Sequence, residues 1–331
     1  MASIAAWRAG AAPPMSHRMS EPALETRVVR TAVPPEGEAV RTEVPRRRIK
    51  DLEVMVADVI QETPDTTTLV LFTGNDRLDY LAGHFLTIDP RQFPALERWV
   101  AYLEDLKGKR EAPRAYSLAS APHERYLAIT VKEETYQSGR TRYPPLLSPM
   151  LVRRTPRGSR FVITGFTGPY VLPPRVEEKT DHLVHVVAGS GSVPNWSILK
   201  HALREHPRLR HTFVYSNRTW DDVIYREGLR QLEAEHPDRL RVVHTLTREP
   251  EPERHGPGVR RGRISAELLR ELVPDPRAAL YYACGPAVGP IERAAAKERG
   301  ETPAPRFLEA ALGALDELGV PRDRVKRESY G

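Results

Sequence analysis

The stretch LVHVVAGSGSVPN, residues 183–195, decides the class of the fold. Its first six residues are almost all apolar, as in a buried parallel strand, and a turn with two glycines leads into a segment that favours a helix. Glycines let the backbone approach a phosphate closely, and the next helix offers unpaired N–H groups to it. The third glycine of the common dinucleotide fingerprint is missing, so this is a variant pattern. The residues predicted to bind nucleotide phosphate are Gly189, Ser190, Gly191, Ser192 and Pro194.

The same alternation continues to the end of the chain. Strands are expected at residues 183–188, 212–215, 240–246, 280–284 and near 325, and helices from 194, at 223–232 and 266–272, from about 290, and at 307–318. Apolar strands separated by helices predict a doubly wound parallel sheet with helices on both faces. We assign residues 176–331 to this domain.

The preceding segment has a different pattern. Short β-rich runs at residues 53–59, 66–72, 84–88, 126–132 and 160–164 are separated by Pro and Gly, and residues 114–117 form a further strand candidate. This spacing predicts an antiparallel six-stranded β-barrel over residues 51–175. One helix interrupts it, with its apolar face at helical spacing: Leu96, Trp99, Val100, Leu103 and Leu106. The predicted fold class is therefore β + α/β.

Composition narrows the class of protein. At 331 residues the chain is long enough for about two domains, and 40% hydrophobic with 28% charged residues is typical of a globular protein. Residues 1–50, rich in Pro, Ala, Arg and Glu, are predicted to be disordered. They hold nine Lys or Arg and five Asp or Glu, so they supply +4 of the formal +6 charge and the rest only +2. This balance argues against nucleic-acid binding.

Other classes are also disfavoured. The single cysteine, Cys284, excludes an internal disulfide and a four-thiolate iron–sulfur cluster, so an iron–sulfur centre must come from a partner. The histidines lack metal-ligand spacing and the chain lacks a nucleophile elbow with a convincing partner triad, so we expect neither a metal site nor a hydrolase. Without an apolar stretch that could span a bilayer or a signal peptide, the expected location is cytoplasmic, with no membrane contact.

The tetrapeptide Arg114-Ala115-Tyr116-Ser117 suits a flavin. A flavin needs a cation for its pyrophosphate, a flat aromatic face against its ring system and a hydroxyl near the nitrogen that accepts hydride. Alternation along a strand places Arg114 and Tyr116 on one face. Ser148, at a predicted helix start, is a further candidate for the pyrophosphate or an ordinary N-cap. Alone, the tetrapeptide is a weak signal, and one more barrel strand with an exposed arginine is the simpler interpretation.

Two further segments bear on the nucleotide. The strand after the glycine turn ends in Ser216 and Arg218 without a carboxylate, and together with Arg226 these could hold the extra phosphate of NADPH. Asp221 and Asp222 favour NADH or simply begin a helix. Cys284, Gly285 and Pro286 end another strand, where a thiol could lie against a nicotinamide or be a small buried hydrophobe.

Together these motifs resemble the ferredoxin–NADP⁺ reductase superfamily, from about residue 51 to the C-terminus. Arg114, Tyr116 and Ser117 match its Arg-x-Tyr-Ser flavin motif, and residues 189–194 and 284–286 match its NAD(P) turn and nicotinamide-side motif. The match is best to stand-alone bacterial or plant-type reductases, and the C-terminal half is also similar to reductase components of oxygenases. The resemblance implies a flavin-binding barrel followed by an NAD(P)-binding domain.

The resemblance also implies residue roles. Thr130 and Lys132 would lie along the phosphoribityl and adenosine part of FAD, and Tyr225 would stack on the adenine of the nucleotide. Glu328-Ser329-Tyr330 is similar to the plant-type ending Glu-Thr-Tyr, in which the tyrosine covers the flavin and the glutamate assists proton exchange. The catalytic residues implied are Ser117, Cys284, Glu328 and Tyr330.

Two positions depart from the family pattern. Gly331 follows the tyrosine, which is therefore penultimate, and the Gly-x-x-Ser pyrophosphate motif is replaced by Pro145-Leu146-Leu147-Ser148. The second departure leaves FMN open beside FAD.

The expected function is an FAD-dependent reductase that takes hydride from NADPH and passes single electrons to ferredoxin or flavodoxin. The alternatives are a reductase component that feeds an oxygenase directly and a non-enzymatic interaction module. Basic clusters at residues 107–110, 153–160, 260–261 and 324–327 fit an acidic partner or a solvated surface.

Overall fold

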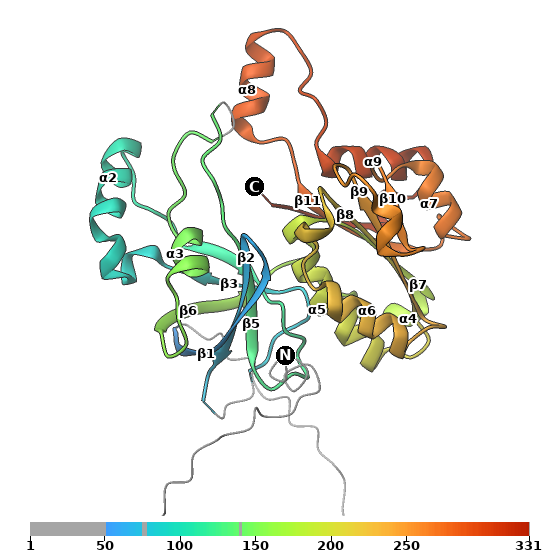
Figure 1. The fold of residues 1–331 in the computed structure, drawn as a ribbon, viewed down its shortest axis with the longest axis horizontal. Coiled ribbons are helices and arrows are strands. Elements are labelled where there is room, and N and C mark those ends of the chain that lie inside the picture. The colour runs from blue at the N-terminus through green and yellow to red at the C-terminus, as the bar shows by residue number, and fades with distance from the viewer. Residues whose placement is uncertain (1–50, 75–77, 139–140, 331) are drawn as a thin grey trace, which may run out of the picture. The chain divides into compact units, whose positions relative to one another are not determined.

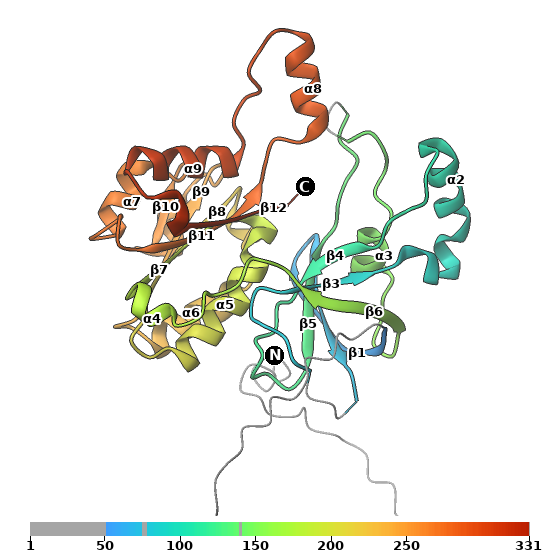
Figure 2. The same ribbon diagram turned by 180° about the vertical axis from the view of Figure 1, so that it is seen from behind.

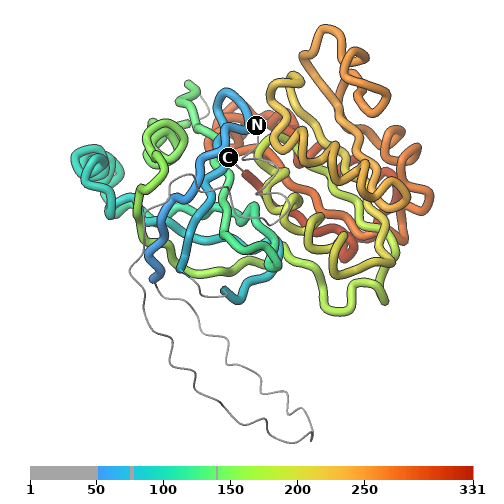
Figure 3. Tube along the Cα trace, turned by 60° about the horizontal axis from the view of Figure 1, so that its bottom comes forward, coloured from blue at the N-terminus to red at the C-terminus, as the bar shows by residue number. Residues whose placement is uncertain are grey.

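The computed structural model describes residues 51–74, 78–138 and 141–330, which form two sheets and their helices. The prediction of disorder for residues 1–50 lies outside the described residues. The tube in Figure 3 follows the chain through the antiparallel sheet first and then through the parallel sheet. The predicted fold class is confirmed.

The antiparallel sheet has six strands in the order β4-β3-β6-β1-β2-β5 (Figure 1). Their bounds are β1 Leu52–Thr63, β2 Thr66–Phe72, β3 Phe85–Ile88, β4 Arg114–Ser117, β5 Leu127–Lys132 and β6 Arg160–Thr167. Leu118, which follows β4, forms an antiparallel bridge with Ile129 of β5. Since β4 and β5 are the two outer strands, this bridge closes the sheet into a barrel.

Two helices accompany the barrel, α2 (Glu97–Lys107) and α3 (Ser148–Arg153). The predicted interrupting helix is thus confirmed as α2. Its Val100 and Leu103 are buried and pack with Leu146, whereas Leu106, expected on the apolar face, is 50% exposed. The buried stripe of α2 is therefore narrower than its sequence period indicates.

The second sheet is parallel, in the order β10-β9-β8-β7-β11-β12. Its strands are β7 His182–Ala188, β8 Arg210–Asn217, β9 Leu240–Leu246, β10 Val259–Arg261, β11 Leu280–Pro286 and β12 Val325–Tyr330. The chain reverses its order at β7, between β8 and β11, and ligands of open α/β sheets bind at the carboxyl ends of strands beside such a switch. The strand β10 was not predicted, because three residues are too few to show a period.

Helices cover both faces of the parallel sheet, as Figures 1 and 2 show. Leu269 of α7 and Leu308 of α9 pack on one face, and Ile198 of α5 and Val176 of α4 on the other. The helices of this part are α4 Val176–Lys179, α5 Ser192–Glu205, α6 Arg226–Glu235, α7 Ala266–Leu272, α8 Pro290–Glu298 and α9 Phe307–Glu317. Short 3₁₀ helices lie at Pro90–Gln92, Pro94–Leu96, Gly189–Gly191, Trp220–Asp222, Pro252–His255 and Arg322–Arg324. No helix in the described ranges is long and apolar enough to cross a membrane.

The helix predicted at residues 223–232 begins later, at Arg226. Tyr225 has a left-handed backbone with φ of 59°, which ends regular helical geometry on its N-terminal side. The preceding turn, Trp220–Asp222, has its own cap, in which the Asp222 carboxylate accepts from the backbone N–H and the hydroxyl of Thr219.

A long excursion, residues 287–306, separates β11 from α9 and carries α8. In both ribbon views α8 stands apart from the helices that cover the sheet. The two limbs are joined at the base, because the carboxylate of Glu309 in α9 accepts hydrogen bonds from the backbone N–H groups of Val288 (2.9 Å) and Arg306 (3.2 Å). The excursion therefore leaves and re-enters the fold at one place.

Candidate functional site

The carboxyl end of β4 meets the last strand of the parallel sheet. Ser117 Oγ and Tyr330 Oη are hydrogen-bonded to each other, although 213 positions separate them in the chain. Ser117 is buried and Tyr330 is half-buried. Burial raises the pKa of the Tyr330 phenol well above its usual value, so its hydroxyl stays protonated near neutral pH.

The other residues of the β4 motif are held by the barrel. Arg114 Nη2 pairs with Glu111 Oε2 at 2.6 Å, and Arg114 Nη1 donates to the carbonyl of Ala112 at 2.7 Å. The Glu111 carboxylate is buried and also pairs with Lys107; burial raises its pKa, but the two cations lower it more. Tyr116 packs against the barrel core. Arg114 and Tyr116 are both half-buried and Ala115 is exposed, as the predicted alternation requires.

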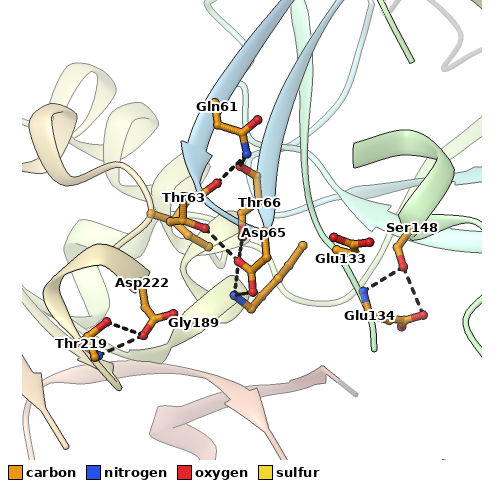
Figure 4. Close-up of polar contacts among 12 residues, drawn as sticks. Gln61, Thr63, Asp65, Thr66, Glu133, Glu134, Ser148, Gly189, Thr219 and Asp222 are labelled. Carbon is orange, nitrogen blue, oxygen red and sulfur yellow. Dashed lines mark hydrogen bonds and ion pairs between the residues drawn. The ribbon is translucent and has the colours of Figure 1, made fainter. Parts of the chain in front are cut away.

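Ser148 is the first residue of α3, as expected. Its Oγ accepts the backbone N–H of Glu134 at 3.0 Å, and Figure 4 shows this contact together with the longer one to the Glu134 carboxylate. Because Ser148 is buried, a ligand would reach its hydroxyl only by replacing Glu134.

Two residues of β5 lie in different surroundings. Thr130 is buried, with its Oγ1 bonded to Thr68 Oγ1 at 2.7 Å and to the hydroxyl of Tyr225. Lys132 Nζ lies 2.6 Å from Asp65 Oδ1, a carboxylate that the hydroxyls of Thr63 and Thr66 also contact (Figure 4). Lys132 also lines the cavity described below.

The glycine turn is packed directly against the neighbouring strand. A Cβ on Gly191 would lie 2.2 Å from the carbonyl oxygen of Cys284, so only glycine fits between the turn and β11. Ser192 is buried, and its Oγ donates to the carbonyl of Gly189 and accepts from Tyr215 Oη. Pro194 is buried in α5. Gly191, Ser192 and Pro194 are thus packed inside the turn and the helix that follows it. Gly189 and Ser190 line the cavity that is described below.

A cavity of about 600 Å³ lies at the carboxyl edge of the parallel sheet. It brings together six of the residues that the sequence singled out: Lys132, Gly189, Ser190, Ser216, Arg218 and Pro286. Residues that follow β7, β8 and β9 line it side by side with the end of β11, as the switch-point rule requires.

The cavity is cationic. Arg218, Arg248 and Arg263 line it, and none has an ion pair or a side-chain hydrogen bond among the residues that the structure describes. Asp222 also lines it, but its carboxylate caps Thr219. Three unpaired guanidinium groups suit a ligand with several phosphate oxygens.

Cys284 and Glu328 lie on neighbouring strands in register with each other. Cys284 is fully buried, and this burial, followed by the nearby Glu328 carboxylate, raises the pKa of its thiol. Burial also raises the pKa of Glu328 to about 7. Glu328 Oε2 is buried and has no hydrogen-bond partner among the described residues. A buried acceptor without a partner is costly, which makes it a candidate contact for a donor group of a ligand.

Similar proteins bear on the family and the fold of this chain. The sequence family described as an oxidoreductase NAD-binding domain matches residues 186–295. The ferredoxin reductase component of 3-ketosteroid-9-alpha-monooxygenase from Mycobacterium tuberculosis (strain CDC 1551 / Oshkosh) is 31% identical over 291 residues, which is 84% of this chain and 65% of that protein. The chain thus spans slightly less than two thirds of that relative.

Solved structures agree on the fold. The Flavohem-like FAD/NAD binding domain of nitric oxide dioxygenase from Vibrio cholerae has a TM-score of 0.62 at 22% identity, covering 86% of this chain and all of that one. A mutant of ferredoxin–NADP⁺ reductase from Plasmodium falciparum with 2′P-AMP has a TM-score of 0.58 at 16% identity, covering 85% of this chain and 96% of that one. The chain therefore has the two-domain fold of the ferredoxin–NADP⁺ reductase-like superfamily.

Members of this superfamily have a fold for a flavin and a pyridine nucleotide, and the donor set here fits both groups. Arg114 and the Ser117–Tyr330 hydroxyl pair offer a cation and hydroxyl donors beside the Tyr116 ring. The cationic cavity offers phosphate-binding groups, and the unpartnered Glu328 Oε2 is an acceptor near the buried Cys284.

Two predicted residues of the superfamily site lie elsewhere. Tyr225 is buried, with its ring stacked on Trp196 (centroids 4.9 Å apart) and its hydroxyl on Thr130, so its predicted adenine contact would require this packing to open. Arg226 lies over the Trp220 ring and lines a different cavity, of about 480 Å³. The structure does not bring either residue to the cavity of about 600 Å³.

Sequence reasoning missed several residues that line the cavity of about 600 Å³. Thr247 and Arg248 follow β9, a strand that the sequence predicts correctly, so the rule applied to Ser216 and Arg218 would have found them. Arg263 follows the unpredicted β10. The residues that enter from the excursion and α9, such as Arg306 and Phe307, have no local motif.

Proposed function

We propose that this protein is a flavin-dependent reductase that oxidises NADPH and passes electrons singly to a separate iron–sulfur protein or flavodoxin. The observation that carries the proposal is the hydrogen bond between Ser117 and Tyr330, which joins the flavin-motif strand to the strand beside Cys284. This contact supports a single site for the two motifs, as a transfer between two bound rings requires.

A bound flavin would supply the hydride-accepting and one-electron chemistry of the reaction. The residues supply binding and alignment. Arg114 holds the pyrophosphate, Tyr116 and Tyr330 offer aromatic faces for the flavin ring, and Ser117 donates a hydrogen bond near the reacting nitrogen. Tyr330 has to move aside before a nicotinamide can lie beside Cys284.

Glu328 exchanges the proton that accompanies reduction. A carboxyl group with a pKa near 7 is a suitable acid and base at neutral pH, because both of its forms are populated. Its position opposite Cys284 in the sheet puts it next to the proposed nicotinamide contact.

NADPH is the proposed reductant rather than NADH. Ser216 and Arg218 line the cavity together with Arg248 and Arg263, and unpaired guanidinium groups favour a ligand that carries one more phosphate. Asp222 is the one carboxylate among the residues lining the described cavity, and its capping contact with Thr219 leaves it less available to a ribose.

The second candidate acceptor is an oxygenase that receives electrons directly. It is favoured by the 31% identity to a protein described as a ferredoxin reductase component of a monooxygenase. Reduction of a candidate oxygenase in the absence of any ferredoxin would support this second candidate. Failure of both ferredoxin and flavodoxin to accept electrons from the reduced protein would overturn the first.

The first test is anaerobic mixing of the purified protein with NADPH, and separately with NADH, while the visible spectrum is recorded. We expect a flavin band that NADPH bleaches at least tenfold faster than NADH. Equal rates would support the reductase and overturn the choice of NADPH. A bound flavin that neither nucleotide reduces, or a protein that stays colourless after FAD is added, would favour a non-catalytic interaction module.

A further inference from the structure

The excursion between β11 and α9 brings a guanidinium group into the nucleotide cavity. Arg306, its last residue, lines the cavity together with Phe307 and Pro286. The Phe307 ring packs on Gly285, where a Cβ would come within 2.5 Å of it. Arg306 therefore enters the cavity beside the Cys-Gly-Pro segment and not among the guanidinium groups at the other end.

The order of the strands defines these two ends. From β10 to β11 the carboxyl edge presents Arg263, then Arg248, then Arg218, then the glycine turn, and finally Pro286 with Arg306. The glycine turn, the proposed pyrophosphate site, lies between the Arg218 end and the Arg306 end. With the nicotinamide beside Cys284, Arg306 is on the nicotinamide side of the pyrophosphate.

Arg306 has hydrogen-bonding capacity left for a ligand. Its Nη1 donates to the carbonyl of Ala287 at 3.1 Å and lies 3.5 Å from Glu292 Oε2. Its Nε and Nη2 have no hydrogen-bond partner among the residues described. The contact to Ala287 ties the last residue of the excursion to its first, so the guanidinium is held in place before a ligand arrives, and less ordering entropy is lost on binding.

We propose that Arg306 is a binding residue for the nicotinamide half of the pyridine nucleotide, where it contacts the phosphate or ribose oxygens on that side. This inference rests on the proposed function. In this proposal the excursion supplies the cation that binds this half of the ligand. Glu292 weakens that binding, since its carboxylate competes with the ligand for the Arg306 guanidinium.

The test is calorimetric titration of the purified, flavin-loaded protein with NADP⁺ and, separately, with 2′-phospho-AMP, which lacks the nicotinamide half. For Arg306→Gln we expect about tenfold weaker binding of NADP⁺ and less than a twofold change with 2′-phospho-AMP, in line with the loss of a charge-assisted hydrogen bond. The matched control is Arg299→Gln, an exposed arginine of the same excursion that pairs with Glu301 and does not line the cavity. It should bind both ligands like the unchanged protein.

A second variant separates binding from a purely structural role. Glu292→Gln removes the charge facing Arg306 and keeps an oxygen for the backbone N–H of Gly289, which Glu292 accepts at 3.0 Å. If Arg306 binds the nucleotide, this variant should bind NADP⁺ as well as or better than the unchanged protein. If Arg306 only ties the excursion together, Glu292→Gln should weaken binding as Arg306→Gln does.

Two outcomes would overturn different statements. Unchanged NADP⁺ affinity in Arg306→Gln, or an equal loss with 2′-phospho-AMP, would overturn the assignment of Arg306. An unchanged protein that binds neither ligand would overturn the NADPH site of the proposed function.

Discussion

Tyr330, the last described residue, is hydrogen-bonded through its hydroxyl to the hydroxyl of Ser117, 213 positions earlier in the chain. Ser117 ends β4 of the barrel, and Tyr330 ends β12, the edge strand of the parallel sheet. Because both residues end their strands, the contact depends on how two separately formed sheets are placed. It is also the contact that a bound nicotinamide would have to disturb, so both partners can be tested by mutation.

Replacement of Ser117 by Ala should slow flavin reduction by NADPH about tenfold or more while leaving the flavin bound. In the proposed function the hydroxyl donates near the atom that receives the hydride, and loss of such a donor lowers the rate more than it weakens binding. Stopped-flow absorbance gives the rate, and the flavin-to-protein ratio gives the occupancy. An unchanged reduction rate would falsify the role of Ser117.

Removal of the Tyr330 ring, in Tyr330→Ser, should tighten NADP⁺ binding about tenfold, because the ring occupies the place proposed for the nicotinamide. Tyr330→Phe is the matched control: it keeps the ring and loses only the bond to Ser117, so its affinity should change less than threefold. Difference spectra of the flavin report both affinities. Equal affinities in the unchanged protein and Tyr330→Ser would remove Tyr330 from the site.

Two glycines of one turn should respond differently to Ala. Gly191→Ala places a Cβ 2.2 Å from the Cys284 carbonyl oxygen, so β11 or the turn must shift, at a cost of more than about 2 kcal/mol. Gly189→Ala meets open space and loses only the ease of its positive φ, 52°, at about 1 kcal/mol. Denaturant titration of both variants measures the free energy of unfolding. A larger loss in Gly189→Ala would contradict the packing described here.

Glu328 should make stability depend on pH. Its pKa is about 7 in the folded chain and 4.5 ordinarily, so folding favours the protonated form. The group costs nothing below the ordinary value and destabilises progressively as the pH rises through 7. Glu328→Gln should therefore gain about 2 kcal/mol relative to the unchanged protein between pH 5 and pH 8, allowing for partial exposure. Denaturant titrations at the two pH values measure this, and a pH-independent difference would refute it.

Nucleotide choice should depend on Arg218 more than on Arg226. Arg218 lines the cavity without an ion pair among the described residues, so Arg218→Gln should lower the ratio of kcat/KM for NADPH to that for NADH about tenfold. Arg226 lies over Trp220 in the other cavity, so Arg226→Gln should change the ratio less than threefold. The reverse ranking would restore the prediction made for Arg226 from sequence.

Much of the fold could be predicted because its signals are local. The bounds of β9 and α7 match the predicted ranges 240–246 and 266–272, since apolar periodicity depends only on nearby residues. The glycine turn after β7 was likewise legible, as a strand, two glycines and a helix follow each other directly. Short or irregular elements could not be predicted. The strand β10 is too short to show a period, and the left-handed backbone of Tyr225 delays the start of α6 without any periodic signal.

The candidate site also contains residues whose positions follow from a local rule and residues whose positions do not. Gly189, Ser190, Ser216, Arg218 and Pro286 end successive parallel strands, and that rule alone brings them to one edge. Tyr225 was assigned to the same site by resemblance and Arg226 from its place after Ser216 and Arg218. The side chain of Tyr225 contacts Thr130, and that of Arg226 contacts Trp220. Which way a side chain turns at a helix start depends on neighbours from distant parts of the chain.

The sequence by itself determined the two-sheet architecture and the sheet edge that carries the candidate site, because strand periodicity and glycine turns are properties of contiguous residues. Only the tertiary structure decided that Tyr330 meets Ser117, that Gly191 touches Cys284 and that Arg306 enters the cavity. These contacts join segments that are far apart in the chain, and they arise only when the sheets and the excursion have packed. Their energies depend on atomic distances across that packing, which no local pattern encodes.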